Sequence, residues 1–226
     1  MLQEILLLLA PLLLGAQCVL TLVLVKGDIC PGQRGRVHKV LPAIAILWLA
    51  IASLKIQAFL VTFAIAYFFS QVQTKKTRDE GPLWVMHLAN GLAFAYTLIQ
   101  ASESSSWIAG INTLIQVFLC GALFAHLLLT IARTRLQAFH RILPVTGVCA
   151  AMLTSLLALA QAYQFDESQR ELLIQPLLIT LSLMVAATLL WCWHLISGKA
   201  PNKALLALAQ LVMLTSVYSG QILFVV

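Results

Sequence analysis

The sequence predicts an all-α, polytopic membrane helix bundle with eight transmembrane helices, and three observations support this fold class. Of the 226 residues, 61% are hydrophobic and only 10% are charged, whereas a soluble domain carries roughly 25% charged residues. Five stretches without Asp, Glu, Lys or Arg reach the length of about 20 residues that crosses a bilayer core; they are residues 5–25, 107–132, 142–163, 172–196 and 204–226. Basic residues gather in short segments between such stretches. Because lipid offers no water to backbone groups, each stretch is expected to be a helix.

The first half of the chain is expected to hold four spans. Residues 5–25 form the first, which we interpret as a retained helix because no basic segment precedes it as in a secretory signal. Residues 40–74 are apolar except for Lys55, and as one helix they would be about 52 Å long, too long for a single span. We therefore predict a hairpin that turns at Lys55 and supplies the second and third spans. The fourth span covers residues 83–99, with Pro82 at its start.

The second half is expected to repeat this organisation, with short loops between long spans. A polar turn at residues 100–106 leads to the fifth span at 107–132. The sixth, seventh and eighth spans cover residues 142–163, 172–196 and 204–226, and an acidic loop at 165–171 separates the sixth from the seventh. We interpret residues 1–226 as a single integral membrane domain.

A weak internal repeat relates the two halves. The sequence HKVLP at residues 38–42 opens the second span, and HRILP at residues 140–144 opens the sixth. Pro82 opens the fourth span as Pro201 opens the eighth. One interpretation is a duplication, with parallel four-helix halves at residues 1–104 and 105–226. The other is a common preference for basic residues and proline at helix starts.

The distribution of charge predicts the orientation. If the N-terminus is outside, 12 of the 14 Lys and Arg residues lie in cytoplasmic segments, and only Lys55 and Arg170 lie outside. Cytoplasmic loops are rich in these residues, so we expect a multi-pass protein of the bacterial inner (cytoplasmic) membrane with both termini extracytoplasmic. A seven-span alternative, which fuses the second and third spans, would lose this asymmetry. The same rule explains the net charge of +6 without a nucleic-acid partner.

The chain lacks the usual catalytic and cofactor motifs. It has no Walker loop, G-x-G-x-x-G or H-E-x-x-H sequence, and no carboxylate lies in the middle of a span, which argues against an ion pump. Its five cysteines form no C-x-x-C pair, so we expect neither a disulfide framework nor a metal site.

The histidines leave two interpretations open. His87, His126 and His194 fall at similar depth near the cytoplasmic ends of their spans. Two of them could be axial ligands of a b-type haem, or all three could be interfacial histidines whose polar tips reach headgroups or loop carbonyls. His38 and His140, in basic loops, suit the second interpretation.

Lys55 is the only charged residue of the predicted hairpin, and Gln57 follows it closely. One interpretation is a loop lysine that snorkels to the membrane surface. The other is a polar group at the mouth of a lipid-facing pocket, with Glu103 of the next outer loop as its neighbour.

Three stretches resemble the membrane-anchor subunit family of dimethyl sulfoxide reductase (DmsC). They are GAQC at residues 15–18 with the helix up to VKGD at 25–28, FLCG at 118–121 through LLL at 127–129, and FHRILP at 139–144 through AQ at 160–161. The resemblance covers spans one, two, five, six and the start of seven. It implies eight spans, no bound haem, and a non-catalytic anchor that docks an iron–sulfur subunit beside a molybdopterin catalytic subunit and passes it electrons from menaquinol.

Where that family has its quinol histidine, this sequence has Lys55, within SLKIQ at residues 53–57. The resemblance therefore implies a quinol-binding site at Lys55, Gln57 and Glu103, in which the lysine ammonium donates a hydrogen bond to a quinone oxygen. The alternative class is a non-redox membrane protein, such as an assembly factor or a small-solute carrier. A neighbouring gene for an iron–sulfur subunit would distinguish the two classes.

Overall fold

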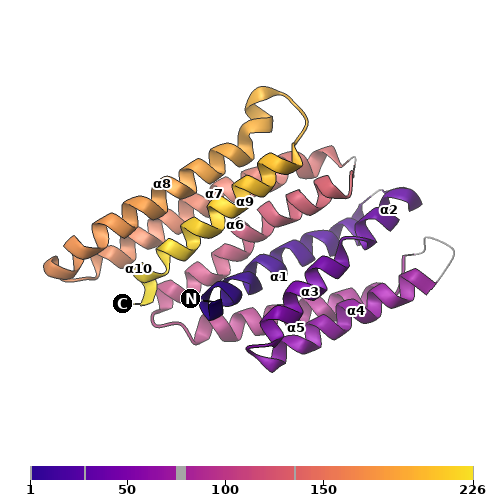
Figure 1. Ribbon diagram of the computed structural model, residues 1–226, viewed down its shortest axis with the longest axis horizontal. Helices are drawn as coiled ribbons and strands as arrows, with labels where there is room; N and C mark the ends of the chain where they lie inside the picture. The colour runs from indigo at the N-terminus through magenta and orange to yellow at the C-terminus, as the bar shows by residue number, and fades with distance from the viewer. Residues whose placement is uncertain (1, 28, 75–79, 135, 226) are drawn as a thin grey trace.

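The protein is an all-α bundle whose helices run side by side (Figure 1). The computed structural model describes residues 2–27, 29–74, 80–134 and 136–225. The helices are α1 (Leu2–Lys26), α2 (Pro31–His38), α3 (Leu41–Ala52), the short 3₁₀ helix η1 (Ile56–Ala58), α4 (Phe59–Thr74), α5 (Leu83–Ser102), α6 (Trp107–Ile131), α7 (Gln137–Tyr163), α8 (Glu167–Ser197), α9 (Lys203–Gly220) and α10 (Ile222–Val225). Since α2 continues into α3, η1 into α4 and α9 into α10, the described chain forms eight helical rods, which confirms the predicted fold class.

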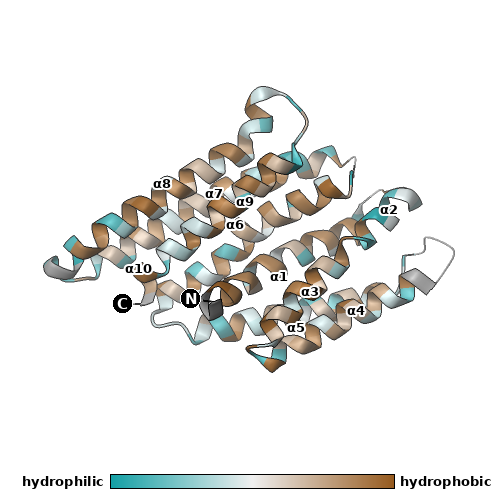
Figure 2. Cartoon of the chain, in the orientation of Figure 1, coloured by the Kyte–Doolittle hydropathy of each residue, from teal (hydrophilic) through white to brown (hydrophobic). Residues whose placement is uncertain are grey.

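Six of these rods are long and apolar enough to cross a membrane on their own. They are Ile5–Lys26, Pro31–Ala52, Trp107–Ile131, Gln137–Tyr163, Arg170–Ser197 and Lys203–Phe224. The rod formed by η1 and α4 is apolar but shorter, and α5 carries the polar residues His87 and Asn90. The hydropathy of the residues along the ribbon agrees, because the middle of the bundle is mainly hydrophobic and its two ends are more hydrophilic (Figure 2). The chain is an integral, multi-pass membrane protein.

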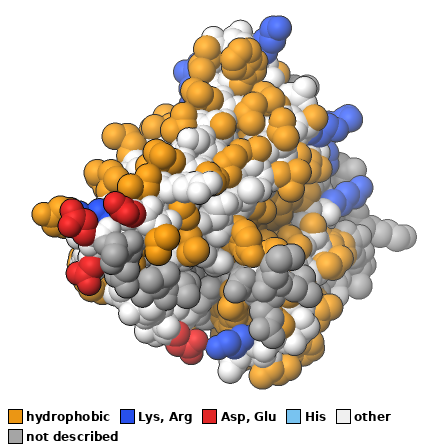
Figure 3. Space-filling model, turned by 60° about the vertical axis from the view of Figure 1, so that its left-hand side comes forward, with side chains coloured by type: hydrophobic (Ala, Val, Ile, Leu, Met, Phe, Trp, Pro, Cys, Tyr) orange, Lys and Arg blue, Asp and Glu red, His pale blue; other side chains and the backbone are white. Residues whose placement is uncertain are grey.

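The two ends of the bundle differ in charge. The acidic end consists of residues 53–57, 102–106 and 163–171, and the basic end consists of residues 26–27, 29–41, 132–134, 136–141 and 197–203. Acidic side chains accordingly gather on one side of the molecule and most Lys and Arg side chains on the other (Figure 3). Lys75, Lys76, Arg78 and Arg135, which the orientation prediction also used, lie outside the described residues.

The hairpin predicted at Lys55 is confirmed, because α3 ends at Ala52 and η1 begins at Ile56. The start of α5 at Leu83, directly after Pro82, is confirmed too. Four boundaries differ. The second span begins with α2 at Pro31, inside the predicted basic loop, so HKVLP lies within this span and does not open it. Helix α5 continues to Ser102, so the turn predicted from residue 100 begins later; α7 starts at Gln137, so HRILP lies inside it; and α8 starts at Glu167, inside the predicted acidic loop. The repeat itself stays a prediction.

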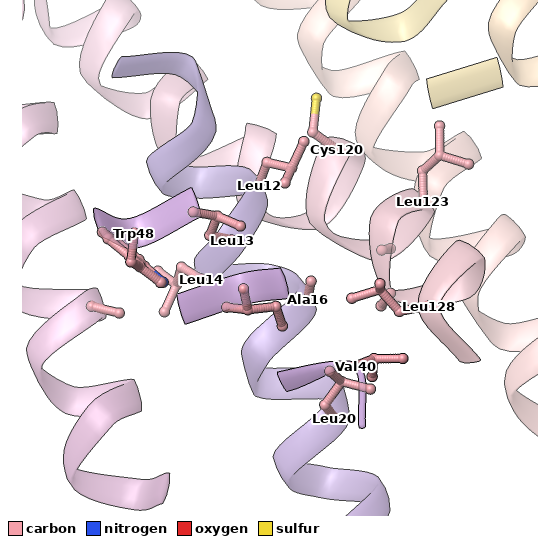
Figure 4. Packing of buried hydrophobic residues seen from close by; sticks show 14 of the residues in the cluster. Leu12, Leu13, Leu14, Ala16, Leu20, Val40, Trp48, Cys120, Leu123 and Leu128 are labelled. Carbon is pink, nitrogen blue, oxygen red and sulfur yellow. The ribbon is translucent and has the colours of Figure 1, made fainter. Parts of the chain in front are cut away.

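The core is centred on α1, which packs along α6 on one side and against α3 and α5 on the other. Leucines on several faces of α1 are buried, among them Leu12, Leu13 and Leu20. They meet Trp48 of α3 and Leu123 and Leu128 of α6 (Figure 4). A helix that is apolar on all sides is expected to be a central helix of a membrane bundle, and α1 fills this position.

Three prolines lie inside helices, and two of them create a contact between helices. A proline has no N–H for the carbonyl four residues before it, so Pro11 frees the carbonyl of Leu7 and Pro144 frees that of His140. The Nε2 atom of Gln100 in α5 donates to the Leu7 oxygen at 3.0 Å. The Nε2 atom of His194 in α8 lies 3.0 Å from the His140 oxygen. In both cases, a side chain of a neighbouring helix replaces the missing backbone donor.

Candidate functional site: a cavity at the acidic end

The structure brings Lys55 and Glu103 together across the acidic end. Lys55 stands in the turn between α3 and η1, in extended conformation with φ −128°, and Glu103 caps the C-terminus of α5. Lys55 Nζ lies 3.1 Å from Glu103 Oε2. The side chains are 46% and 58% exposed, and exposed ion pairs contribute only about 0–1 kcal/mol to stability. The pair therefore joins the two loops without being a main support of the fold.

A cavity of about 400 Å³ lies beside this ion pair. Its volume falls in the range of roughly 300–1,000 Å³ that is usual for small-molecule sites. Its walls are mainly apolar and come from α1, α4 and α5, with Leu7, Leu60, Leu92, Ala95 and Ile99. Its polar groups are Lys55, Gln57, Tyr96, Gln100, Glu103 and Ser104. All three residues predicted for a quinol site thus line one cavity.

Gln100 lines the cavity and ties α5 to α1. Its Nε2 donates to the Leu7 carbonyl, which fixes the orientation of the amide and leaves Oε1 buried without a partner. A buried acceptor without a donor costs about 1–3 kcal/mol.

Tyr96 packs against Trp48, which is itself held by a buried hydrogen bond. Its ring meets that of Trp48 edge-on, with centroids 5.7 Å apart, and the Nε1 of Trp48 donates to Gln17 Oε1 at 3.1 Å. Trp48 and Gln17 are fully buried, so this side of the cavity is fixed. The sequence analysis did not identify Tyr96 or Gln100, and only their position on the last two turns of the fourth span could have indicated them.

A second polar cluster lies at the basic end, where three histidines from α6, α7 and α8 meet. The Nε1 of Trp191 donates to His126 Nδ1 at 2.9 Å, and His126 Nε2 lies 3.0 Å from His140 Nδ1. Since indole N–H only donates, His126 accepts at Nδ1 and its remaining proton, on Nε2, points to His140. His194 packs against His126 with ring centroids 5.1 Å apart.

The histidine cluster differs from the placement expected for His140, and it agrees with the shared depth expected for His126 and His194. His140, expected in a loop, is part of α7 and of the cluster. His126 and His194, expected at similar depth, do meet, whereas His87 is exposed on α5. The rings of His126 and His194 pack edge-on against each other, and the absence of haem stays a prediction. Within the described residues, no group of three or more His, Cys, Asp or Glu has the arrangement of a metal site.

Comparison with known proteins places the chain in a family without assigning it an activity. The chain is 34% identical over 153 residues to an uncharacterized protein of Haemophilus influenzae, an alignment that covers 63% of this chain and 57% of that relative. The matched part thus spans little more than half of the relative. No solved structure matches the chain. Residues 3–221 match a family described as an integral membrane domain, and because this match covers nearly the whole chain, the protein belongs to that integral membrane domain family.

Proposed function

We propose that the protein is the membrane anchor of a reductase complex and that the cavity beside Lys55 and Glu103 binds the headgroup of menaquinol. The observation that carries this proposal is the ion pair at the rim of a mainly apolar cavity. A quinol headgroup has an apolar ring and two polar oxygens at opposite ends, so it needs apolar walls and a few separate polar groups. The resemblance of several helices to the DmsC family supports the same function.

The residues of the cavity match the steps of quinol oxidation. The ammonium of Lys55 would donate a hydrogen bond to one of the two quinol oxygens, both of which become carbonyls on oxidation. Oxidation of one quinol to the quinone releases two protons and two electrons. Glu103 would take the two protons in turn and pass each to the aqueous phase, to which it is exposed. The two electrons would go to the iron–sulfur subunit docked beside the cavity, which would supply the path to the molybdopterin subunit.

The partner subunit would dock on the acidic end. Residues 53–57, 102–106 and 163–171 form this end, and the first two segments border the cavity. The excess of Lys and Arg at the other end supports a cytoplasmic basic end, which would place both termini and the docking surface outside the bacterial inner membrane.

Binding of a quinone analogue tests the site. We expect the purified protein to bind 2-heptyl-4-hydroxyquinoline N-oxide, with quenching of the ligand's fluorescence, and Lys55→Ala to weaken binding by roughly tenfold, as loss of one charge-assisted hydrogen bond predicts. Arg170→Ala is the matched control, since it removes a positive charge from the same end outside the cavity. Equal binding by Lys55→Ala and wild type would exclude Lys55 from the site, and a wild type that binds no analogue would exclude the site itself.

Co-purification tests the anchor. Affinity purification of the tagged chain from native membranes is expected to retain an iron–sulfur subunit and a molybdopterin subunit. If the chain binds the analogue but purifies without a redox partner, the anchor assignment is wrong while the site remains. If neither is found, a non-redox membrane function replaces the proposal.

A further inference from the structure

A second, larger cavity lies at the basic end, far along the bundle from the proposed quinol site. It has a volume of about 680 Å³ and lies between the first turn of α7, the end of α8 and the loop that follows α8. Arg141 and Lys199 line it, and no Asp or Glu does. Neither cation forms an ion pair with the described residues. The cavity therefore has positive charge without a counter-charge.

His194 also lines this cavity, but its ring is engaged with the backbone. Its Nε2 faces the carbonyl oxygen of His140 at 3.0 Å, and its Nδ1 faces that of Trp191 at 2.9 Å. Both ring nitrogens are therefore used within the bundle, and His194 forms a wall of the cavity without offering a donor to a ligand.

The ring of His194 is held in this position by its surroundings. The His140 carbonyl lacks a backbone donor because residue 144 is proline, so it needs the Nε2 proton of His194. His126 packs edge-on against the ring and is itself fixed by Trp191.

The start of α7 also borders the cavity. Gln137, the first residue of α7, lines it, and the first backbone N–H groups of a helix are free to bind an anion. The cavity thus has two cationic side chains without an acidic partner and a helix N-terminus.

We propose that this cavity binds a phosphate group, held by Arg141 and Lys199 together with the first backbone N–H groups of α7. Basic pockets between transmembrane helices are typical sites for anionic lipid headgroups, and the cavity lies at the end of the apolar spans, at headgroup level. The phosphate belongs either to an anionic phospholipid or to a soluble phosphate compound. The chemistry of recognition is the same in both cases, and the source is decided by experiment.

Native mass spectrometry of the purified protein tests the lipid source. Wild type is expected to retain phosphatidylglycerol in preference to phosphatidylcholine. The double variant Arg141→Gln/Lys199→Gln is expected to lose about 30-fold in affinity for phosphatidylglycerol, since each surface cation contributes roughly a factor of five. The control Lys26→Gln/Lys39→Gln removes the same charge from the same end, outside the cavity, and is expected to bind as wild type.

A thermal-shift measurement tests the soluble source. Sodium phosphate, compared with sodium chloride at equal ionic strength, would raise the melting temperature of wild type but not of Arg141→Gln/Lys199→Gln. A phosphate shift without preference for phosphatidylglycerol assigns the site to a soluble phosphate, and the reverse assigns it to a lipid. Equal retention of both lipids together with no phosphate shift overturns the proposal, as does an equal loss in the Lys26→Gln/Lys39→Gln control. Melting temperatures without ligand show whether each variant is folded.

Discussion

Gly15 of α1 and Gly121 of α6 face each other where these two helices cross. A Cβ atom on Gly121 would stand 2.6 Å from the Cα of Gly15, and one on Gly15 would stand 2.0 Å from the carbonyl oxygen of Val117. These contacts are with backbone atoms, so no side-chain rotation can relieve them. Helices in lipid associate mainly through close packing, and this crossing joins the central helix to the second half of the bundle.

Gly121→Ala is therefore expected to lower the melting temperature in detergent. Overpacking of this kind costs about 1–3 kcal/mol. Gly91→Ala is the control, since a Cβ at Gly91 meets no atom within 4 Å. If both variants melt like wild type, the two helices do not approach as closely as described.

Replacement of Gln100 tests the role of Pro11. Gln100→Leu leaves the carbonyl of Leu7 without its donor, an effect of about 1–3 kcal/mol. In a Pro11→Ala background, residue 11 regains an N–H that can donate to Leu7 within the helix. We expect Gln100→Leu to lower the melting temperature less in that background than in wild type. Equal losses in the two backgrounds would contradict this coupling.

Trp191→Phe tests the histidine cluster. The phenyl ring keeps most of the packing but removes the N–H that His126 Nδ1 accepts, so we expect a loss of about 1–3 kcal/mol. Trp193→Phe, two residues along the same helix and 56% exposed, is the control and should change stability little. The measurement is thermal unfolding followed by fluorescence of the remaining tryptophans.

Cys30 reports on orientation, because it lies just outside the second span. The backbone N–H of Gln33 and the charge of Arg36 lower the pKa of this thiol below its ordinary value. The reactive thiolate is therefore present at lower pH than in an ordinary cysteine, and labelling should reach half its maximal rate at lower pH than that of a cysteine introduced at Ser102. In a variant without the other native cysteines, a membrane-impermeant reagent should label Cys30 in inverted vesicles only. Labelling from the periplasmic side would reverse the proposed orientation.

Most of the fold could be predicted because it depends on segment length and charge. The turn at Lys55 followed from one charge in a stretch too long for a single span, and Pro82 marked the start of α5. Boundaries with polar residues were harder, since α8 begins at Glu167 and includes residues that hydropathy assigns to a loop. A helix continues into the headgroup region as long as its backbone bonds are satisfied, whatever the polarity of its side chains.

The pairing of helices could not be predicted in the same way. Hydropathy shows which segments cross the membrane but not which faces meet, so the contact of Lys55 with Glu103, 48 positions along the chain, stayed open. The meeting of His140 with His126 depends on α7 starting at Gln137. Gly121 carries no local sign that it faces Gly15, because glycine is frequent in membrane helices for several reasons.

The internal prolines of α1 and α7 affect how neighbouring helices keep their relative heights in the bundle. Apolar faces in lipid can slide along one another at little cost, since every depth offers similar contacts. A carbonyl freed by proline exists at one depth only, so Gln100 fixes the height of α5 against α1, and His194 fixes that of α8 against α7. The first of these hydrogen bonds is near the acidic end and the second is near the basic end. Each half of the bundle is therefore fixed in height at one end, and the motion left to these neighbouring helices is a tilt whose amplitude is largest at the opposite end.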